Sequence, residues 1–355
     1  MTKKSDKLLR IKYIKRLCIE LDRLTKDGET KAINIIKDAN KNIPTLVIQD
    51  LGGSNDDFKK ILGIELNKCQ IKNVVIYFEY GLLVKPFDTL LTHATNIQLR
   101  GYKISRNTIK ALNKPIINTL IIQDSTLDTT INMEYIENNL KQLQRIDRLH
   151  IEIINEAVNQ FMKRLLSCKI NDLSMFCCKN PSFPYKLGGN ISKAFICPLH
   201  HMHSFLKQYS DNFFDELKTA IPANEQQLNL CIDILSMKNY GKITIIYSQR
   251  HPNKMIEVIH LLKNIAENKD DILTTNNQKR VLSIHRNCAI SRDLPNTYDE
   301  IPGIIDAIKS CLWMFKLFNT IQIKLNVLPK IDLTGIVLRN DINIQEISGY
   351  IIIEL

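Results

Sequence analysis

The residue types best suited to chemistry gather between positions 177 and 203. They are thiols and imidazoles, the side chains that zinc prefers as ligands, and they comprise Cys177, Cys178, Cys197, His200 and His203. Their spacing is irregular and contains no paired C-x-x-C knuckle, so buried cysteines beside a histidine-rich surface loop explain them equally simply. We expect this second arrangement and assign no metal site.

Other sequence signatures of catalysis or cofactor binding are not found. The pairs Gly52-Gly53 and Gly188-Gly189 lack the Lys-Ser/Thr of a phosphate-binding loop and are more simply turns. No H-E-x-x-H, nucleophile elbow or kinase signature occurs. The sequence therefore predicts a protein that is not an enzyme, with no catalytic residues and no cofactor.

Positive charge is concentrated in the N-terminal portion of the chain. The formal net charge is +11: residues 1–200 carry 31 Lys+Arg against 20 Asp+Glu, whereas residues 201–355 carry 17 of each. Such a bias is typical of contact with nucleic acid, an acidic protein surface or an anionic membrane. No run forms a compact basic patch, so lysines that keep the chain soluble also account for the excess.

Cysteine usage indicates an intracellular location, either cytoplasmic or nuclear. The nine cysteines are odd in number, and several lie in apolar strand-like runs such as Leu17-Cys18-Ile19 and Leu230-Cys231-Ile232, where we expect small buried hydrophobes in a reducing compartment. The first residues lead into only Leu8-Leu9 before Arg10, which is too short for a signal peptide. No apolar run is long enough to span a membrane.

A sequence repeat between Asn96 and Leu127, which we call the phrase, predicts the elements that would position any site. The pattern of residues 97–104 occurs again at 120–127, 23 residues later, and the intervening residues 106–112 have the pattern of one or two helical turns. A strand, a small helix and a return at fixed period predict a solenoid.

The same alternation recurs along most of the chain. Further strand-like runs begin at Leu17, Leu46, Val74, Leu149, Leu173 and Phe195, and others lie at 228–234, 243–247, 282–284, 321–325, 336–338 and 350–353. The spacing of apolar residues is helical at 31–40, 158–165, 255–266 and 304–318. It is also helical from Phe205 to Leu217, where an aromatic or apolar residue occurs at every fourth position. We expect residues 1–16 to be a basic cap or tail, and residues 17–355 to be a single irregular array.

The phrase resembles the leucine-rich repeat, whose strand reads L-x-L-x-x-N-x-L. Units of 23 to 29 residues with an intervening helix are similar to the cysteine-containing and ribonuclease-inhibitor-like types. The resemblance implies an α/β solenoid with a curved parallel sheet on its concave side and helices on its convex side. A parallel neighbour needs a crossover, which a helix of two to four turns supplies.

One position of the phrase is polar, and in the family its side chain bonds to backbone groups of the turn that leaves each strand. Asparagine suits this position because its amide both donates and accepts hydrogen bonds. In this sequence the position holds Asp22, Tyr102, Ser125, Cys178, Asn287 and Asn326. Tyr102 is too large to replace an asparagine directly, so that unit departs from the family pattern.

The resemblance also implies a function, namely binding of a partner protein by the outward residues of the strands. Neighbouring parallel strands align these residues into a broad and rigid surface. We expect contacts from Gln98, Arg100, Ile121, Gln123, His150, Glu152, Gln322 and Lys324. The sequence therefore predicts a non-catalytic protein-interaction module whose partner is not identified.

Two other functions are compatible with the sequence. By analogy with repeat proteins that carry an F-box, the array could be the substrate-receptor subunit of a ubiquitin ligase, although residues 1–16 are too short to hold an F-box. The basic N-terminal portion could instead bind nucleic acid. The outward strand residues are mixed in sign and chemistry, which suits a protein surface better than a phosphate backbone.

Overall fold

Parallel strands joined by helices build two separate units, Met1–Gly189 and Asn190–Leu355. The computed structural model describes residues 15–38, 43–50, 56–78, 85–153, 156–177, 186–220, 225–248, 256, 259–260, 280–287, 305–307, 318–324, 343–347 and 350–354. Among the described helices, none has the length and apolar character that crossing a bilayer requires.

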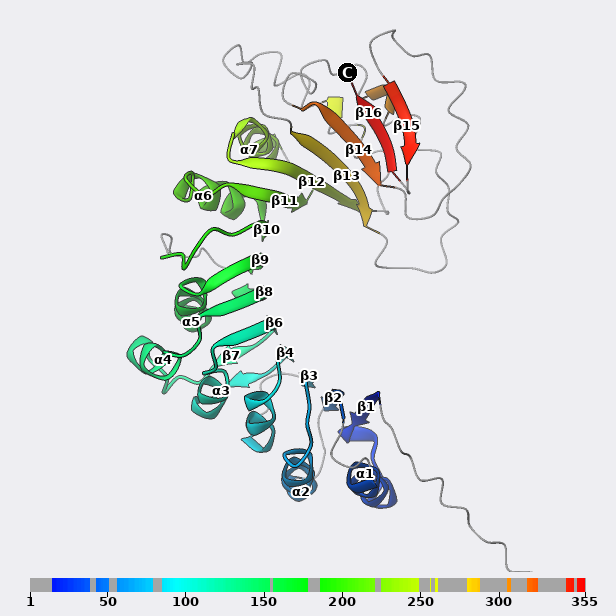
Figure 1. Ribbon diagram of the computed structural model, residues 1–355, viewed down its shortest axis with the longest axis vertical. Coiled ribbons are helices and arrows are strands. Elements are labelled where there is room, and N and C mark those ends of the chain that lie inside the picture. The colour runs from blue at the N-terminus through cyan, green and yellow to red at the C-terminus, as the bar shows by residue number, and fades with distance from the viewer. Residues whose placement is uncertain are drawn as a thin grey trace, which may run out of the picture. The chain divides into compact units, whose positions relative to one another are not determined.

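In the described part of the first unit, seven strands form one parallel sheet in chain order. They are β1 (Arg16–Glu20), β2 (Thr45–Asp50), β3 (Asn73–Phe78), β4 (Asn96–Arg100), β6 (Ile116–Gln123), β8 (Arg145–Ile153) and β9 (Lys169–Cys177). The connections contain the short helix η1 (Leu21–Arg23) and the helices α1 (Lys26–Asp38), α2 (Asp56–Leu66), η2 (Lys85–Thr92), α3 (Arg106–Ala111), α4 (Met133–Asn139) and α5 (Glu156–Leu166). Figure 1 shows α1 to α5 following one another along one side of the strands.

A small second ladder follows the strands β4 and β6. It pairs β5 (Lys103–Ile104) with β7 (Thr126–Leu127), in parallel and 23 residues apart. The repeat from Asn96 to Leu127 is thus a structural repeat, with α3 at the residues where helical turns were predicted.

Two ladders of inward side chains form the core of the first unit. Alternate residues of a strand point to opposite faces, and the parallel register aligns the buried ones from strand to strand. The first ladder contains Leu46, Val74, Ile97, Leu120, Leu149 and Leu173, and the second contains Ile48, Ile76, Leu99, Ile122, Ile151 and Met175. Burial of each such side chain stabilises the fold by about 1.5–3 kcal/mol.

Basic side chains tie consecutive connections of the first unit together. The ammonium group of Lys114 donates to the carbonyl oxygens of Leu91, Thr92 and Ala94, which end the preceding connection. The Arg164 guanidinium does the same two connections later, donating through Nη2 to the carbonyl oxygens of Leu140 and Leu143. A cation is favourable here because the last carbonyls of a helix lack intrahelical partners. Burial lowers the pKa of Lys114 to about 8, so its amine is still mostly protonated at neutral pH.

Tyr102 finds a structural role that its size did not suggest. Its ring lies 5.8 Å from that of Phe78, and its hydroxyl donates to Oδ1 of the buried Asp88 at 2.6 Å. The hydroxyls of Ser105 and Thr108 also donate to Asp88, both at 2.7 Å. Burial, and then the charge of Asp88, raise the pKa of Tyr102 well above 10. The tyrosine therefore completes a buried polar cluster between η2 and α3.

Ser125 occupies the equivalent place in the next unit and bonds to the backbone. Its hydroxyl accepts from the backbone N–H of Tyr102 at 3.3 Å and donates to the carbonyl of Gln123 at 2.8 Å. One small polar side chain thus links two successive turns, which is the role that the sequence analysis gives to this position.

Among its described residues, the second unit contains five parallel strands and an antiparallel edge. The parallel strands are β10 (Lys193–Cys197), β11 (Phe214–Ala220), β12 (Tyr240–Ser248), β13 (Val281–Asn287) and β14 (Thr320–Lys324). Next to β14 lie β16 (Tyr350–Glu354) and then β15 (Asn343–Ile347), and the described helices include α6 (Leu199–Gln208) and α7 (Glu225–Ser236). In this unit Arg280 lies between the rings of Tyr240 and Phe318, 4.1 Å and 5.0 Å from their centroids, and donates to the carbonyl of Leu235.

Three local predictions are wrong. The helical spacing from Phe205 to Leu217 ends with α6 at Gln208, and Phe214–Ala220 is a strand because it pairs with both β10 and β12. The run at 228–234 belongs to the helix α7 rather than to a strand. Cys18 is exposed on β1, whereas we expected it to be buried.

The predicted α/β class with parallel strands and intervening helices is confirmed in both units, and it is consistent with a solenoid-like fold. The finer assignment to leucine-rich repeats stays a prediction, as does the grouping of residues 17–355 into one array. The run at 336–338, residues 1–14 of the expected cap and most of the helices expected at 255–266 and 304–318 lie outside the described residues.

Gly188 allows a close approach of two backbone segments in the first unit. Its N–H donates to the carbonyl of Leu166, and a Cβ atom at this position would lie 2.2 Å from the carbonyl oxygen of Ser167. At the adjacent Gly189, the nearest atom to an added Cβ would be a flexible Lys169 carbon at 3.8 Å. Only the first of the two glycines is therefore required by packing.

We predict that Gly188→Ala lowers the free energy of unfolding by about 3 kcal/mol, since the methyl group must displace backbone atoms. Gly189→Ala is the matched control and should change the free energy by less than about 0.5 kcal/mol. Urea unfolding followed by circular dichroism measures both. Equal midpoints for the two variants would contradict the prediction.

We predict that Tyr102→Phe costs about 2 kcal/mol, because a buried carboxylate loses a charge-assisted hydrogen bond. Tyr135→Phe is the control: its hydroxyl makes an exposed contact of 3.4 Å with the Arg106 carbonyl, and its loss should be nearly neutral. Thermal unfolding of the three proteins tests this difference, and a Tyr102→Phe variant as stable as wild type would show that Asp88 does not need the phenol.

Candidate functional site

The candidate site is the side of the first unit's sheet opposite the apolar ladders, which we call the outer face. The parallel register arranges its side chains in rows, and we focus on two of them. The first row contains Cys18, Val47, Val75, Gln98, Ile121, His150 and Ser174; the second contains Glu20, Gln49, Tyr77, Arg100, Gln123, Glu152 and Phe176. A third row, next to the first, contains Arg16, Thr45, Asn73, Asn96, Thr119, Arg148 and Asp172. All are half-buried or exposed, so the outer face is a surface.

Six of the eight predicted contact residues lie together on the outer face. They come from the adjacent strands β4, β6 and β8: Gln98 is beside Ile121, which is beside His150, and Arg100 is beside Gln123. Glu152 follows on β8, next to Phe176 of β9. The period of two along each strand, together with the 23-residue repeat, was enough to place them.

The other two predicted residues belong to the second unit. Gln322 and Lys324 lie on β14, where Gln322 is in register with Ser283 of β13 and, one strand further, Thr244 of β12. Ser283 and Thr244 are fully buried although they occupy the outward positions of their strands. At these two positions the row is closed, whereas Gln322 itself is half-buried.

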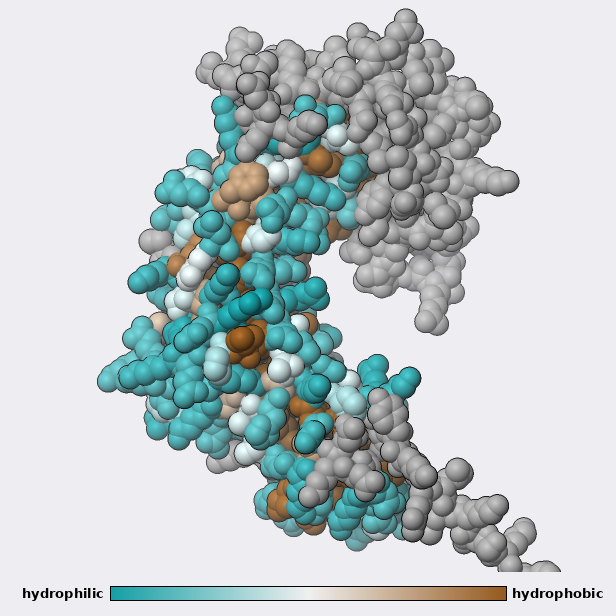
Figure 2. Space-filling view, in the orientation of Figure 1, coloured by the Kyte–Doolittle hydropathy of each residue, from teal (hydrophilic) through white to brown (hydrophobic). Residues whose placement is uncertain are grey.

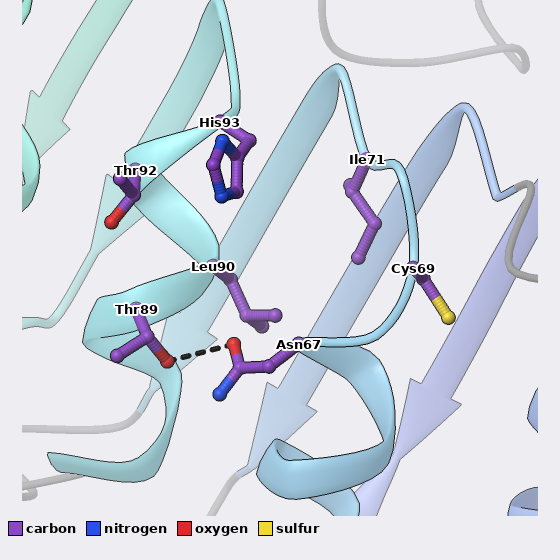
Figure 3. Close-up of a pocket in the computed structure, with 7 residues that line it drawn as sticks. All are labelled: Asn67, Cys69, Ile71, Thr89, Leu90, Thr92 and His93. Carbon is purple, nitrogen blue, oxygen red and sulfur yellow. Dashed lines mark hydrogen bonds between the residues drawn. The ribbon is translucent and has the colours of Figure 1, made fainter.

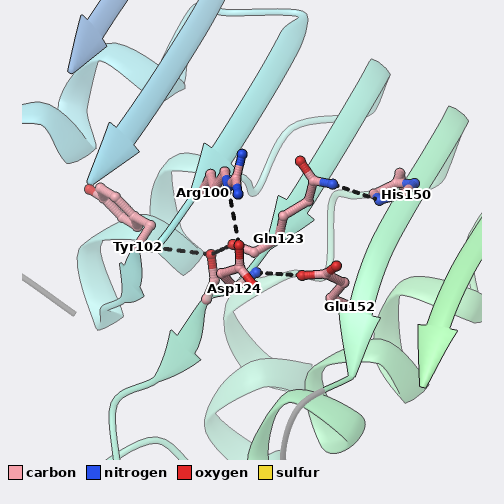
Figure 4. A network of polar contacts seen from close by, with 7 residues as sticks. Arg100, Tyr102, Gln123, Asp124, His150 and Glu152 are labelled. Carbon is pink, nitrogen blue, oxygen red and sulfur yellow. Dashed lines mark hydrogen bonds and ion pairs between the residues drawn. The ribbon is translucent and has the colours of Figure 1, made fainter. Parts of the chain in front are cut away.

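A network of polar contacts joins three strands of the outer face (Figure 4). The guanidinium of Arg100 lies 5.0 Å from the ring centroid of Tyr77, and its Nε donates to Oδ2 of Asp124 at 3.1 Å. The backbone N–H of Asp124 donates to Oε2 of Glu152 at 2.7 Å. These contacts hold long side chains in fixed positions, which reduces the entropy that a binding partner would have to remove.

Asp124 is the residue of this network that the sequence analysis missed. It follows β6 directly and has a φ of 48°, in the left-handed region that few residues other than glycine, asparagine and aspartate adopt. Gly101 holds the same place 23 residues earlier, with a φ of 63°. The correspondence of a glycine and an aspartate in the repeated phrase was the available signal, because both residue types tolerate this backbone conformation.

His150 links the two rows on the next strand. One ring nitrogen, Nε2, lies 3.2 Å from the amide nitrogen of Gln123, and the other, Nδ1, lies 2.9 Å from the hydroxyl of Ser174. Its ring is 5.3 Å from that of Phe176. Burial lowers the pKa of His150, so the imidazole is neutral at pH 7.

The tautomer of His150 decides what the pair with Ser174 can do. The side-chain amide nitrogen of Gln123 can only donate a hydrogen bond, so Nε2 of His150 accepts it. The proton of the neutral imidazole is then on Nδ1. The Nδ1–H then donates to Ser174 and cannot take the proton of its hydroxyl, which is what activation of a serine nucleophile requires. The arrangement supplies hydrogen-bonding groups to a surface.

The electrostatic balance around Asp124 is negative. Asp124 and Glu152 each bring a carboxylate, whereas Arg100 brings one guanidinium. Burial raises the pKa of Glu152, and the Asp124 carboxylate adds to this effect, opposed by the Asp124 backbone N–H and by Arg100. The remaining positions of the two rows are almost uncharged, with Val47, Val75 and Ile121 as aliphatic members.

A pocket of about 330 Å³ lies away from the outer face, between the end of α2 and η2. Its lining is Asn67, Cys69, Ile71, Thr89, Leu90, Thr92 and His93, and the Thr89 hydroxyl donates to the Asn67 side chain at 2.7 Å. Figure 3 shows that the thiol of Cys69 points away from the His93 ring. The pocket therefore does not pair a thiol with an imidazole.

The cysteine and histidine residues considered as metal ligands are placed in different elements. Cys177 ends β9 of the first unit and is buried, Cys178 lies outside the described residues, and Cys197 ends β10 of the second unit. His200 and His203 lie on α6 rather than in a surface loop, and Nε2 of His203 is 3.5 Å from Oδ2 of Asp233. Within the described part of the chain, no three histidine, cysteine or acidic side chains are grouped to hold a metal ion.

Comparison with known proteins assigns no family. No protein-family model matches this sequence, and no curated protein sequence matches it either. Function is therefore inferred from the repeat pattern and from the geometry of the outer face.

We predict a pH-dependent stability from His201 of α6, which is buried. Burial, and then the neighbouring His200, lower the pKa of His201 to about 4. An unfolded histidine protonates near pH 6.5, so between pH 6.5 and 4 the unfolded state binds the extra proton. The contribution of His201 to the free energy of unfolding is therefore fully present above pH 6.5, and it decreases as the pH falls to 4.

Thermal unfolding at a series of pH values tests this expectation. The melting temperature of His201→Gln should decrease less than that of wild type between pH 6.5 and 4, because glutamine does not titrate. His93→Gln removes an exposed histidine and should keep the wild-type profile. If the profiles of the two variants coincide, His201 is not the group responsible.

Proposed function

We propose that this protein is a non-catalytic interaction module that binds a partner protein through the outer face of its first unit. The observation that carries the proposal is the linked pair of half-exposed rows on β4, β6 and β8, where Arg100, Gln123 and His150 are held by neighbouring strands. Fixed side chains on a sheet suit a large interface, since little conformational entropy is lost on binding.

The resemblance to leucine-rich repeats supports the same proposal. Two predicted features of such repeats have counterparts in the first unit: the alternating inward ladders and the small polar residue that links successive turns, here Ser125. We take the outer face to be the surface that corresponds to the binding side in that family.

The charges of the outer face favour a protein over a nucleic acid as the partner. In the two rows Arg100 is the one full cation, and it pairs with Asp124. In the adjoining third row, Arg148 lies 3.5 Å from the carboxylate of Asp172. A phosphate backbone needs several cations. In the view of Figure 2, the described residues of the first unit are mostly hydrophilic, with hydrophobic residues interspersed in small groups.

The experiment that tests the proposal compares proteins retained from a cell extract by full-length wild-type chain and by two variants. Ile121→Lys places a charge in the first row of the outer face. Ile61→Lys makes the same change on α2, where the isoleucine side chain is 52% exposed. Circular dichroism first establishes that all three are folded.

We predict that Ile121→Lys reduces the retained partner at least about tenfold, because an unpaired ammonium would be desolvated in the interface. Ile61→Lys should retain the partner as wild type does. A second variant, Gln98→Ala with Gln123→Ala, should weaken retention without adding charge. Partners retained equally by all of these proteins would overturn the proposal.

A further inference from the structure

The outer face combines a small excess of negative charge with neighbouring aliphatic side chains. Asp124 and Glu152 share a single guanidinium, that of Arg100, on a chain whose net charge is +11. On the strands next to them, Ile121 is half-buried in the first row, and Val75 occupies the same row two strands away. The chemistry of the face thus changes from carboxylate to aliphatic over three strands.

The geometry leaves the negative end open to a partner. The side chains of Arg100 and Asp124 are 49% and 55% exposed, and Glu152 is half-buried beside them. Arg100 is held in place on Tyr77, so it does not move to cover Glu152 without losing that contact. Figure 4 shows that Arg100 and Glu152 reach different parts of Asp124. Arg100 donates to the Asp124 carboxylate, whereas Glu152 accepts from the Asp124 backbone N–H.

We propose that the partner of the outer face presents a peptide segment in which a lysine or arginine is flanked by aliphatic residues. The cation would pair with Asp124 and Glu152, and the aliphatic side chains would pack on Ile121 and Val75. This inference rests on the proposed function, since it names the chemistry of the partner at the same face. Partly buried carboxylates that lack a full complement of cations gain most from such a pairing.

The physical state of Glu152 supports this assignment. Burial and the adjacent Asp124 raise the pKa of Glu152, against the opposing effects of the Asp124 backbone N–H and of Arg100. The net shift means that the ionised form of Glu152 carries an electrostatic cost at this place, and a cation that binds next to the two carboxylates lowers this cost. A polyanion would instead increase it, which separates the proposal from nucleic-acid binding.

The test is selection of peptides from a displayed random library against the full-length chain. We expect the selected peptides to share a lysine or arginine next to aliphatic residues. A synthetic peptide of that sequence should bind about tenfold more weakly to the variant carrying Asp124→Asn and Glu152→Gln, and more weakly again in high salt. Asparagine is chosen because it tolerates the left-handed backbone at position 124.

Two control variants separate the inference from the proposed function. Glu137→Gln removes an exposed carboxylate on α4 and should leave the Kd within about twofold. Ile121→Lys should abolish binding of any peptide that uses the outer face. Selected peptides that are acidic or uncharged, and that lose affinity only for Ile121→Lys, overturn the inference and leave the proposed function standing.

The other outcomes are also decisive. Peptides that bind wild type and Ile121→Lys equally well would overturn both the inference and the proposed function. Single-stranded oligonucleotides, used as a separate probe, should not bind the outer face. Oligonucleotide binding that is lost in Arg100→Ala would assign the face to a polyanion and overturn the inference.

Discussion

The inward ladders of the first unit are the constraint on which its other features depend. The strands β2, β3, β4, β6, β8 and β9 each bury at least two apolar side chains, as β4 does with Ile97 and Leu99, and these must meet their counterparts on the neighbouring strands. A slip of one residue would turn the aliphatic set to the outside and the polar set into the core. Fixing the ladders therefore also fixes which residues form the outer face.

Parallel strands bring a second requirement, because every crossover ends in backbone carbonyls that need partners. The chain meets it with cations from the following connection: Lys114 and Arg164 in the first unit, and Arg280 in the second. Some of the positive charge that suggested an acidic partner is thus used inside the fold. The charge of a whole chain is a weak guide to its ligands when basic side chains have structural acceptors.

The polar groups of the outer face are also positioned by the same architecture. Parallel register places Arg100, Gln123 and Glu152 on neighbouring strands, and the left-handed Asp124 at the end of β6 connects the first and the last of them. The result is a preorganised set of polar groups next to aliphatic ones. This mixture of polar and aliphatic groups is the feature on which our proposal of a protein partner rests.

The sequence by itself determined the strands of the first unit and the outward direction of Gln98, Ile121 and His150, because side-chain alternation is local. It did not determine the run at 228–234 or the end of α6, because short apolar runs fit a helix and a strand equally well until a neighbour pairs with them. Only the tertiary structure decided the roles of Asp124, Lys114 and Tyr102. Their partners lie 20 or more residues away or in another element, so a local sequence pattern does not predict these contacts.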